Sequence, residues 1–152
     1  MKRILLVVLF AAGLWSVAGA ADTSITTGSL LASVSQISGV TCVSLDWGSN
    51  PDGDHISEIR GVYGEIRRIT LAPDTATSQP TNLYDMTLTD RDGFDVLCGQ
   101  GSNLSNSATT FFVPLTGDGV TTATPITVHG SLHLNIDSAG DDKGGTVRLY
   151  LR

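Results

Sequence analysis

The chain has 152 residues, with 15 acidic and 9 basic side chains and a formal net charge of −6 at pH 7. Proteins that bind nucleic acids contact the phosphates through clusters of Lys and Arg, so this acidic balance argues against a nucleic-acid partner. The same shortage of cations disfavours attachment to an anionic membrane surface.

The first 20 residues have the three-part layout of a secretory signal peptide. Lys2 and Arg3 precede an uncharged apolar stretch, Ile4 to Leu14, and the small residues Ala18-Gly19-Ala20 form a cleavage site. The apolar stretch is short for a bilayer span, and no later apolar run is long enough for one. We therefore expect residues 1–20 to be removed during export to the periplasm or the extracellular space, which leaves no membrane attachment.

Cleavage after Ala20 would leave 132 of the 152 residues, the size of one domain, and the loss of two cations would shift the net charge to about −8. Residues 21–39 are mostly Ser, Thr, Gly and small apolar side chains without helical periodicity. We predict that they form an extended N-terminal arm or an edge strand. The folded domain is predicted to cover residues 40–152.

Alternating apolar and polar residues predict short strands throughout this domain. Between residues 56 and 72, Gly61 and Gly64 interrupt the apolar positions, which favours two strands or one bulged strand over a short helix. The other predicted strands cover residues 40–47, 84–89, 94–98, 111–115, 126–137 and 146–152. The strands at 84–89 and 94–98 are predicted to form a hairpin, and the last two strands another.

About seven short strands, with turns between them and no convincing helix, predict an all-β fold. One face of most strands is apolar and the other polar, which suits two sheets packed over one core. The predicted architecture is a single antiparallel β-sandwich or a jelly-roll-like barrel.

The chain contains two cysteines after the signal peptide, Cys42 and Cys98. Export would place them in an oxidising compartment, where a pair of cysteines usually forms a disulfide. We therefore predict a Cys42–Cys98 disulfide.

The stretch Asp90-Arg91-Asp92-Gly93 lies between two alternating runs and predicts a turn closed by Gly93. Asp90, Asp92 and Asp95 are also spaced as in some calcium loops. Calcium prefers six to eight oxygen ligands, and this stretch has no distal Glu in the position that an EF-hand requires. We interpret the stretch as a structural turn and keep a calcium loop as the weaker alternative.

His129 and His133 share one face of a predicted strand, about 13 Å apart, which is too far to bind one metal ion. We interpret them as exposed polar residues and, together with the outward-facing Tyr150, as weak interface candidates. The sequence has no Gly-x-Ser-x-Gly elbow, no Cys-x-x-Cys pair and no phosphate-binding Gly-rich loop. We therefore expect no enzymatic activity, no metal and no cofactor.

Two stretches carry a resemblance to a known group of proteins. They are PTNLYDMTLTDRDGFDVLCGQGSN, Pro80 to Asn103, and VHGSLHLNIDSAGDDKGGTVRLYLR, Val128 to Arg152. Both resemble small β-rich proteins encoded in the structural modules of tailed phages and prophages, and the resemblance covers about residues 60–152. It implies a component of a virion or a similar particle, and it brings no catalytic residues with it.

The expected role is that of a non-enzymatic, exported structural or interaction protein. Its expected partners are further copies of itself or other proteins of a particle or cell surface. Tailed-phage virions assemble in the cytoplasm, so an export signal indicates an exported homologue or a particle assembled at the membrane. The alternative role is a secreted β-sandwich module that binds a surface ligand or carbohydrate.

Overall fold

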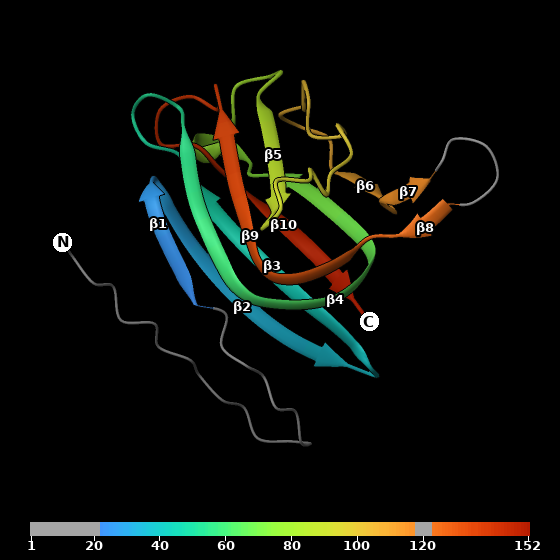
Figure 1. The fold of residues 1–152 in the computed structure, drawn as a ribbon. Helices are drawn as coiled ribbons and strands as arrows, with labels where there is room; N and C mark the ends of the chain where they lie inside the picture. The colour runs from blue at the N-terminus through green and yellow to red at the C-terminus, as the bar shows by residue number, and fades with distance from the viewer. Residues whose placement is uncertain (1–21, 118–122) are drawn as a thin grey trace.

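The computed structural model describes residues 22–117 and 123–152 (Figure 1). The predicted signal peptide, residues 1–20, lies outside the described residues. The described residues form ten strands and one short 3-10 helix: β1 (Thr23–Thr27), β2 (Ser29–Ile37), β3 (Val40–Gly48), β4 (His55–Pro73), η1 (Ala76–Ser78), β5 (Asp85–Asp90), β6 (Thr110–Phe112), β7 (Leu115–Gly117), β8 (Ala123–Pro125), β9 (Thr127–Asp137) and β10 (Gly144–Leu151).

The strands form two antiparallel sheets that share β4. In sheet A the order is β1-β4-β9-β5, and in sheet B it is β2-β3-β10-β4-β6. Strands β7 and β8 form a separate two-stranded ribbon. The predicted all-β, antiparallel, sandwich-like domain is therefore confirmed.

Strand β4 belongs to both sheets because it bends in the middle (Figure 1). Its first half pairs with β9 and its second half with β10. The pairing with β9 shifts between Arg60 and Val62, around Gly61. Gly61 and Gly64 have φ angles of +79° and +134°, which side chains other than glycine rarely adopt. The two glycines thus allow one bulged strand to turn the corner between the sheets.

The core lies between the inner faces of the two sheets. Alternate residues of β3, β5, β9 and β10 point into it, as the sequence pattern predicts. The largest fully buried side chains are Tyr84, Leu45, Ile59, Ile66, Ile69, Leu71, Leu88, Leu97, Leu132, Leu134, Ile136 and Leu149.

Of the two predicted hairpins, the one formed by the last two strands is wrong, and the one at residues 84–98 forms only in part, as a turn with an antiparallel return. Strands β9 and β10 do not pair with each other, because β4 is long enough to lie between them and bind each with a different half. Residues 94–98 do not form a strand: a single bridge joins Thr89 to Asp95, and a series of turns follows. The predicted strand at 111–115 is divided at Pro114, which has no amide hydrogen, into β6 and β7.

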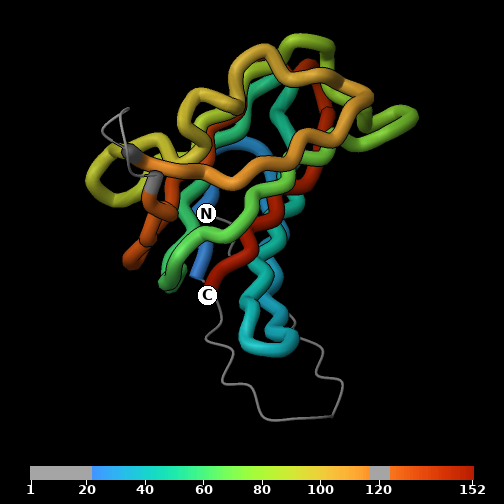
Figure 2. The backbone as a smooth tube through the Cα atoms, turned by 90° about the vertical axis from the view of Figure 1, so that its right-hand side faces the viewer, coloured from blue at the N-terminus to red at the C-terminus, as the bar shows by residue number. Residues whose placement is uncertain are grey.

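Of residues 21–39, predicted as an arm or an edge strand, the described part, residues 22–39, supplies two strands. Strand β1 pairs with β4 in sheet A, and β2 pairs with β3 in sheet B. A two-residue turn, Ser38-Gly39, joins β2 to β3, and both residues have positive φ angles, +51° and +79°. These angles are those of a type I′ turn, which matches the twist of a hairpin. Figure 2 shows the tip of this hairpin projecting beyond the body of the sandwich.

Candidate interaction edge

The three side chains predicted as weak interface candidates do not come together. His129 and His133 are exposed on the outer face of sheet A, and His129 lies against Tyr63 with ring centroids 6.5 Å apart. Tyr150 lies on the outer face of sheet B, where the guanidinium of Arg68 stacks 4.1 Å from its ring centroid. The two histidines and Tyr150 therefore lie on opposite faces of the sandwich and do not form one site.

The acidic turn is held by one of its own carboxylates. Asp90 Oδ1 accepts hydrogen bonds from the amides of Asp92 and Phe94, each at 2.9 Å. The carboxylate of Asp92 is exposed, with Arg91 Nε 3.9 Å away. Within residues 22–117 and 123–152, no group of three His, Cys, Asp or Glu side chains could hold a metal ion. The predicted turn is thus present, and Asp90 shapes it.

Asp95 also accepts hydrogen bonds from backbone amides, in the turn that follows. Its carboxylate accepts hydrogen bonds from the amides of Leu97 at 3.0 Å and Gly99 at 2.9 Å, with a longer contact to the amide of Leu88 at 3.4 Å. A carboxylate bound by several amides replaces the strand pairing that these amides would otherwise need. This explains why residues 94–98 form turns rather than the predicted strand.

The predicted disulfide between Cys42 and Cys98 is wrong, since both thiols are free. Cys42 lies in β3 on the outer face of sheet B, whereas Cys98 lies in the loop that runs along β5 of sheet A. Desolvation and the neighbouring Asp95 carboxylate raise the pKa of the Cys98 thiol. The thiolate is the reactive form, so Cys98 is a poor nucleophile at neutral pH.

Strand β2 has the features of an unprotected sheet edge. Its nine residues, SLLASVSQI, include no charged residue and no proline, and all nine pair with β3 in continuous register. Leu31 and Ile37 point outward and are 58% and 74% exposed. Proteins usually protect an edge strand with charges, proline, a bulge or a short length, and β2 has none of these.

The turn geometry shows which backbone groups of β2 face the free edge. In a hairpin with a two-residue type I′ turn, the closing residues, here Ile37 and Val40, exchange both backbone hydrogen bonds, and such pairs then alternate along the strands. The amide and carbonyl groups of the odd-numbered residues therefore bind β3. Those of Leu30, Ala32, Val34 and Gln36 point away from it, and no described strand pairs with them.

The edge of sheet A at β5 is covered, in contrast to β2. The loop after β5 runs back along this strand and binds its backbone. The hydrogen bonds are Val96 N to Leu88 O at 2.8 Å, Leu104 N to Tyr84 O at 2.8 Å, Met86 N to Gly101 O at 2.8 Å and Asp90 N to Phe94 O at 2.9 Å. The outer edge strands β1 and β6 are short, with five and three residues. Strand β2 is therefore the long edge without a cover among the described residues.

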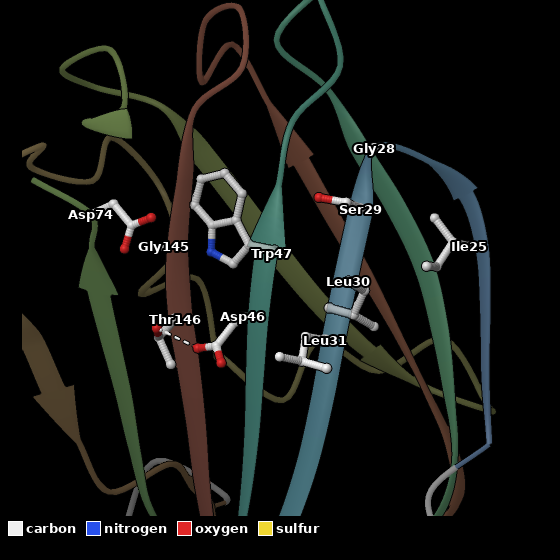
Figure 3. A pocket seen from close by; sticks show the side chains of 10 residues that line it. All are labelled: Ile25, Gly28, Ser29, Leu30, Leu31, Asp46, Trp47, Asp74, Gly145 and Thr146. Atoms are coloured by element: carbon white, nitrogen blue, oxygen red, sulfur yellow. Dashed lines mark hydrogen bonds between the residues drawn. The ribbon is translucent and has the colours of Figure 1, made fainter. Parts of the chain in front are cut away.

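A hollow of about 440 Å³ lies at the start of this edge and extends across β3 to β10 (Figure 3). Ile25 and Leu30 line it at the β1–β2 side, and Asp46 and Asp74 contribute carboxylates. Asp46 Oδ1 accepts a hydrogen bond from Thr146 at 2.7 Å. Trp47, which also lines the hollow, is 3% exposed, and its Nε1 has no acceptor within the described residues.

A serine–histidine pair is present but inaccessible. His55 Nε2 lies 2.8 Å from Ser57 Oγ, and His55 Nδ1 lies 3.2 Å from the Gly48 carbonyl. The carbonyl can only accept, so Nδ1 carries the proton and the Ser57 hydroxyl donates to Nε2. His55 and Ser57 are 0% and 2% exposed. A nucleophile and base must meet a substrate, so this buried pair is structural.

Leu31 and Ile37 were not among the interaction residues predicted from the sequence. A signal for them exists in the sequence. The Ser38-Gly39 dipeptide between an uncharged run and the alternating run 40–47 is typical of a hairpin turn. That turn would have placed Ile37 opposite Val40, as the structure shows.

The described residues include no helix that is long and apolar enough to cross a membrane. A comparison of the sequence with models of known protein families finds no match. A comparison with curated proteins also finds none.

Proposed function

We propose that the protein is an exported, non-enzymatic structural protein that works by assembling with other protein chains in a particle or at a cell surface. The observation that carries this proposal is the uncovered β2 edge, with its exposed Leu31 and Ile37. An uncharged edge of nine residues offers backbone hydrogen bonds and apolar contacts to a further strand.

Two further features support an assembly role. The segments Pro80–Asn103 and Val128–Arg152 resemble structural-module proteins of tailed phages, which implies a particle component. The hydrogen-bonded pair of His55 and Ser57 is sealed in the core, where it supports folding rather than catalysis.

Mass spectrometry of three fractions from the native source tests this proposal: sedimented particles, soluble secreted material and the cell envelope. We expect the protein in particles or in high-mass envelope assemblies, with Ala21 as its first residue. Recovery of the protein solely as a soluble monomer would contradict the assembly role, and a first residue at Met1 would contradict export.

The hollow beside β2 favours a second candidate function, the binding of a small polar ligand such as a carbohydrate. Asp46 and Asp74 present carboxylates that can accept hydrogen bonds from hydroxyl groups, and Trp47 lies beside them in the lining of the hollow.

Tryptophan fluorescence separates this candidate from the assembly role. The chain has two tryptophans, Trp15 and Trp47, and removal of residues 1–20 leaves only Trp47. A saturable change in fluorescence with one member of a glycan panel, lost in Asp46→Asn and Asp74→Asn, would support ligand binding. A flat response across the panel would count against it.

A further inference from the structure

We propose that the partner of the β2 edge is a second copy of this chain, whose own β2 pairs with it in antiparallel fashion about a two-fold axis at Val34. Sheet B of the two copies would then form one continuous sheet. This inference rests on the proposed assembly function and names the surface and the partner through which assembly starts.

The backbone geometry permits this pairing. The amide and carbonyl groups of Leu30, Ala32, Val34 and Gln36 face the free edge, so a hydrogen-bonded pair across the axis must join two even-numbered residues. Pairing about Val34 does so, because Val34 then faces Val34 of the second copy and Ala32 faces Gln36. It also keeps inner-face residues opposite inner-face residues, as a continuous sheet requires.

Side-chain complementarity selects this register over its neighbour. With the axis at Val34, Leu31 lies opposite the second copy's Ile37, and this contact forms twice. Both side chains are more than half exposed in the single copy, at 58% and 74%. With the axis at Ser33, Leu31 would face Ser35 and Ile37 would face Ser29. The Val34 register therefore covers the apolar surface that the other leaves in water.

The β2 edge itself places no charge against a second copy. The chain carries a net charge of −6, yet residues 29–37 have no charge, so two copies can approach here without placing like charges opposite each other. The hollow beside Ile25 and Leu30 is shown in Figure 3. In the Val34 register, Leu30 lies opposite Ser38, so the hairpin tip of the second copy would reach this end of the edge.

Cysteine cross-linking tests both the surface and the register. The background is the full protein with Cys42→Ser and Cys98→Ser, to which Ser33→Cys or Ser35→Cys is added, each at an exposed outer-face position. In the Val34 register residue 33 lies opposite residue 35 in a non-hydrogen-bonded pair, with Cα atoms about 4.5 Å apart, which suits a disulfide. An equal mixture of the two variants should form covalent dimers under mild oxidation, and neither variant should do so alone.

The other outcomes overturn the proposal. Cross-linking of Ser33→Cys with itself would place the axis at Ser33 and reject the Val34 register. Mixed dimers no more abundant than those of the matched control Ser107→Cys, an exposed loop serine, would reject pairing through β2. If particles nevertheless contain the protein, assembly uses another surface. The proposed function then stands while this inference fails.

Charged substitutions at positions 31 and 37 test the same pairing independently, on chains without added cysteines. Leu31→Lys should weaken dimerisation about tenfold, measured by sedimentation velocity, because it removes two apolar contacts from the interface. Adding Ile37→Asp should restore the affinity, since the ammonium introduced at position 31 would then face the carboxylate introduced at position 37 of the second copy. Equal affinity for wild type and Leu31→Lys, or no rescue in the double variant, would contradict this pairing.

Discussion

Burial determines the protonation state of His55. The ring lies in the core between the Gly48 carbonyl and the Ser57 hydroxyl, which together satisfy the neutral tautomer. Burial lowers the pKa of His55 below its ordinary value of 6.5, and the hydrogen bond to Gly48 opposes this only in part.

The lowered pKa of His55 predicts a loss of stability in acid. The unfolded chain binds a proton at His55 below pH 6.5, whereas the folded chain stays neutral until its lower pKa is reached. The free energy of unfolding should therefore be highest above pH 6.5 and fall below it, by at most about 1.4 kcal/mol per pH unit for this one proton. Urea unfolding in a series from about pH 8 to about pH 5 measures the slope.

The control for this slope is a variant at His55 itself. His55→Gln should flatten the pH dependence below pH 6.5, although the variant itself is less stable. An unchanged slope in His55→Gln would mean that other groups cause the acid sensitivity.

Asp95 predicts a second effect of a single residue, because its carboxylate organises the loop over β5. Asp95→Ala removes the acceptor of the Leu97 and Gly99 amides and should lower the free energy of unfolding by about 1–3 kcal/mol. Asp92→Ala removes an exposed carboxylate from the same stretch and should change it by less than about 0.5 kcal/mol. Chemical denaturation of the two variants measures the difference.

The same variants separate a turn from a calcium loop. Since the amides already occupy the carboxylates of Asp90 and Asp95, millimolar calcium should leave the melting temperature of the wild type unchanged. A rise in melting temperature with calcium that disappears in Asp92→Ala would reject the structural interpretation.

The edge strands β5 and β2 differ in whether another segment of the chain covers them. The loop 94–104 covers β5, and its close approach depends on Gly101, where a Cβ atom would fall against the carbonyl oxygen of Met86. Gly101→Ala should therefore push the loop away from β5. We expect a loss of roughly 1–3 kcal/mol in the free energy of unfolding, as for overpacked sites.

Hydrogen exchange identifies the cause of that loss. The amide of Met86 donates to the Gly101 carbonyl, so it should exchange faster in Gly101→Ala while amides in β10 keep their protection. Ser102→Ala, at an exposed neighbouring position, serves as the control and should behave as wild type. Equal protection of Met86 in both variants would show that the loop does not depend on Gly101.

The local pattern of apolar and polar residues predicted most strands correctly. It did not predict which strands pair with each other. The alternation in residues 126–137 identifies β9 and its buried face correctly, because only the side chains of that strand decide it. The pairing of β9 depends on the length and bend of β4. That strand has 19 residues, and two of its glycines have positive φ angles. The interaction edge was missed for a similar reason, since an uncovered strand is recognised only once its neighbours are placed.

The whole molecule is acidic, and this charge opposes any assembly of identical copies. Fifteen acidic and nine basic residues produce a repulsion that acts over the entire surface, whereas the β2 edge contributes only uncharged contacts. At low ionic strength the repulsion extends over about 30 Å, and at physiological ionic strength over about 8 Å. The affinity of the dimer should therefore be lowered by the repulsion between the two acidic chains, and not by charges in the β2 edge.

Added salt should consequently tighten the dimer. Screening weakens the repulsion between the two acidic copies and leaves the backbone hydrogen bonds and apolar contacts of β2 nearly unaffected, so the dimer dissociation constant should fall as sodium chloride is raised. Sedimentation velocity at low and physiological salt measures the change. Asp92→Asn, which removes one exposed charge in the turn after β5, should tighten the dimer at low salt and have less effect at high salt. A dissociation constant that rises with salt would instead indicate an interface held by ion pairs, which the uncharged β2 edge does not offer.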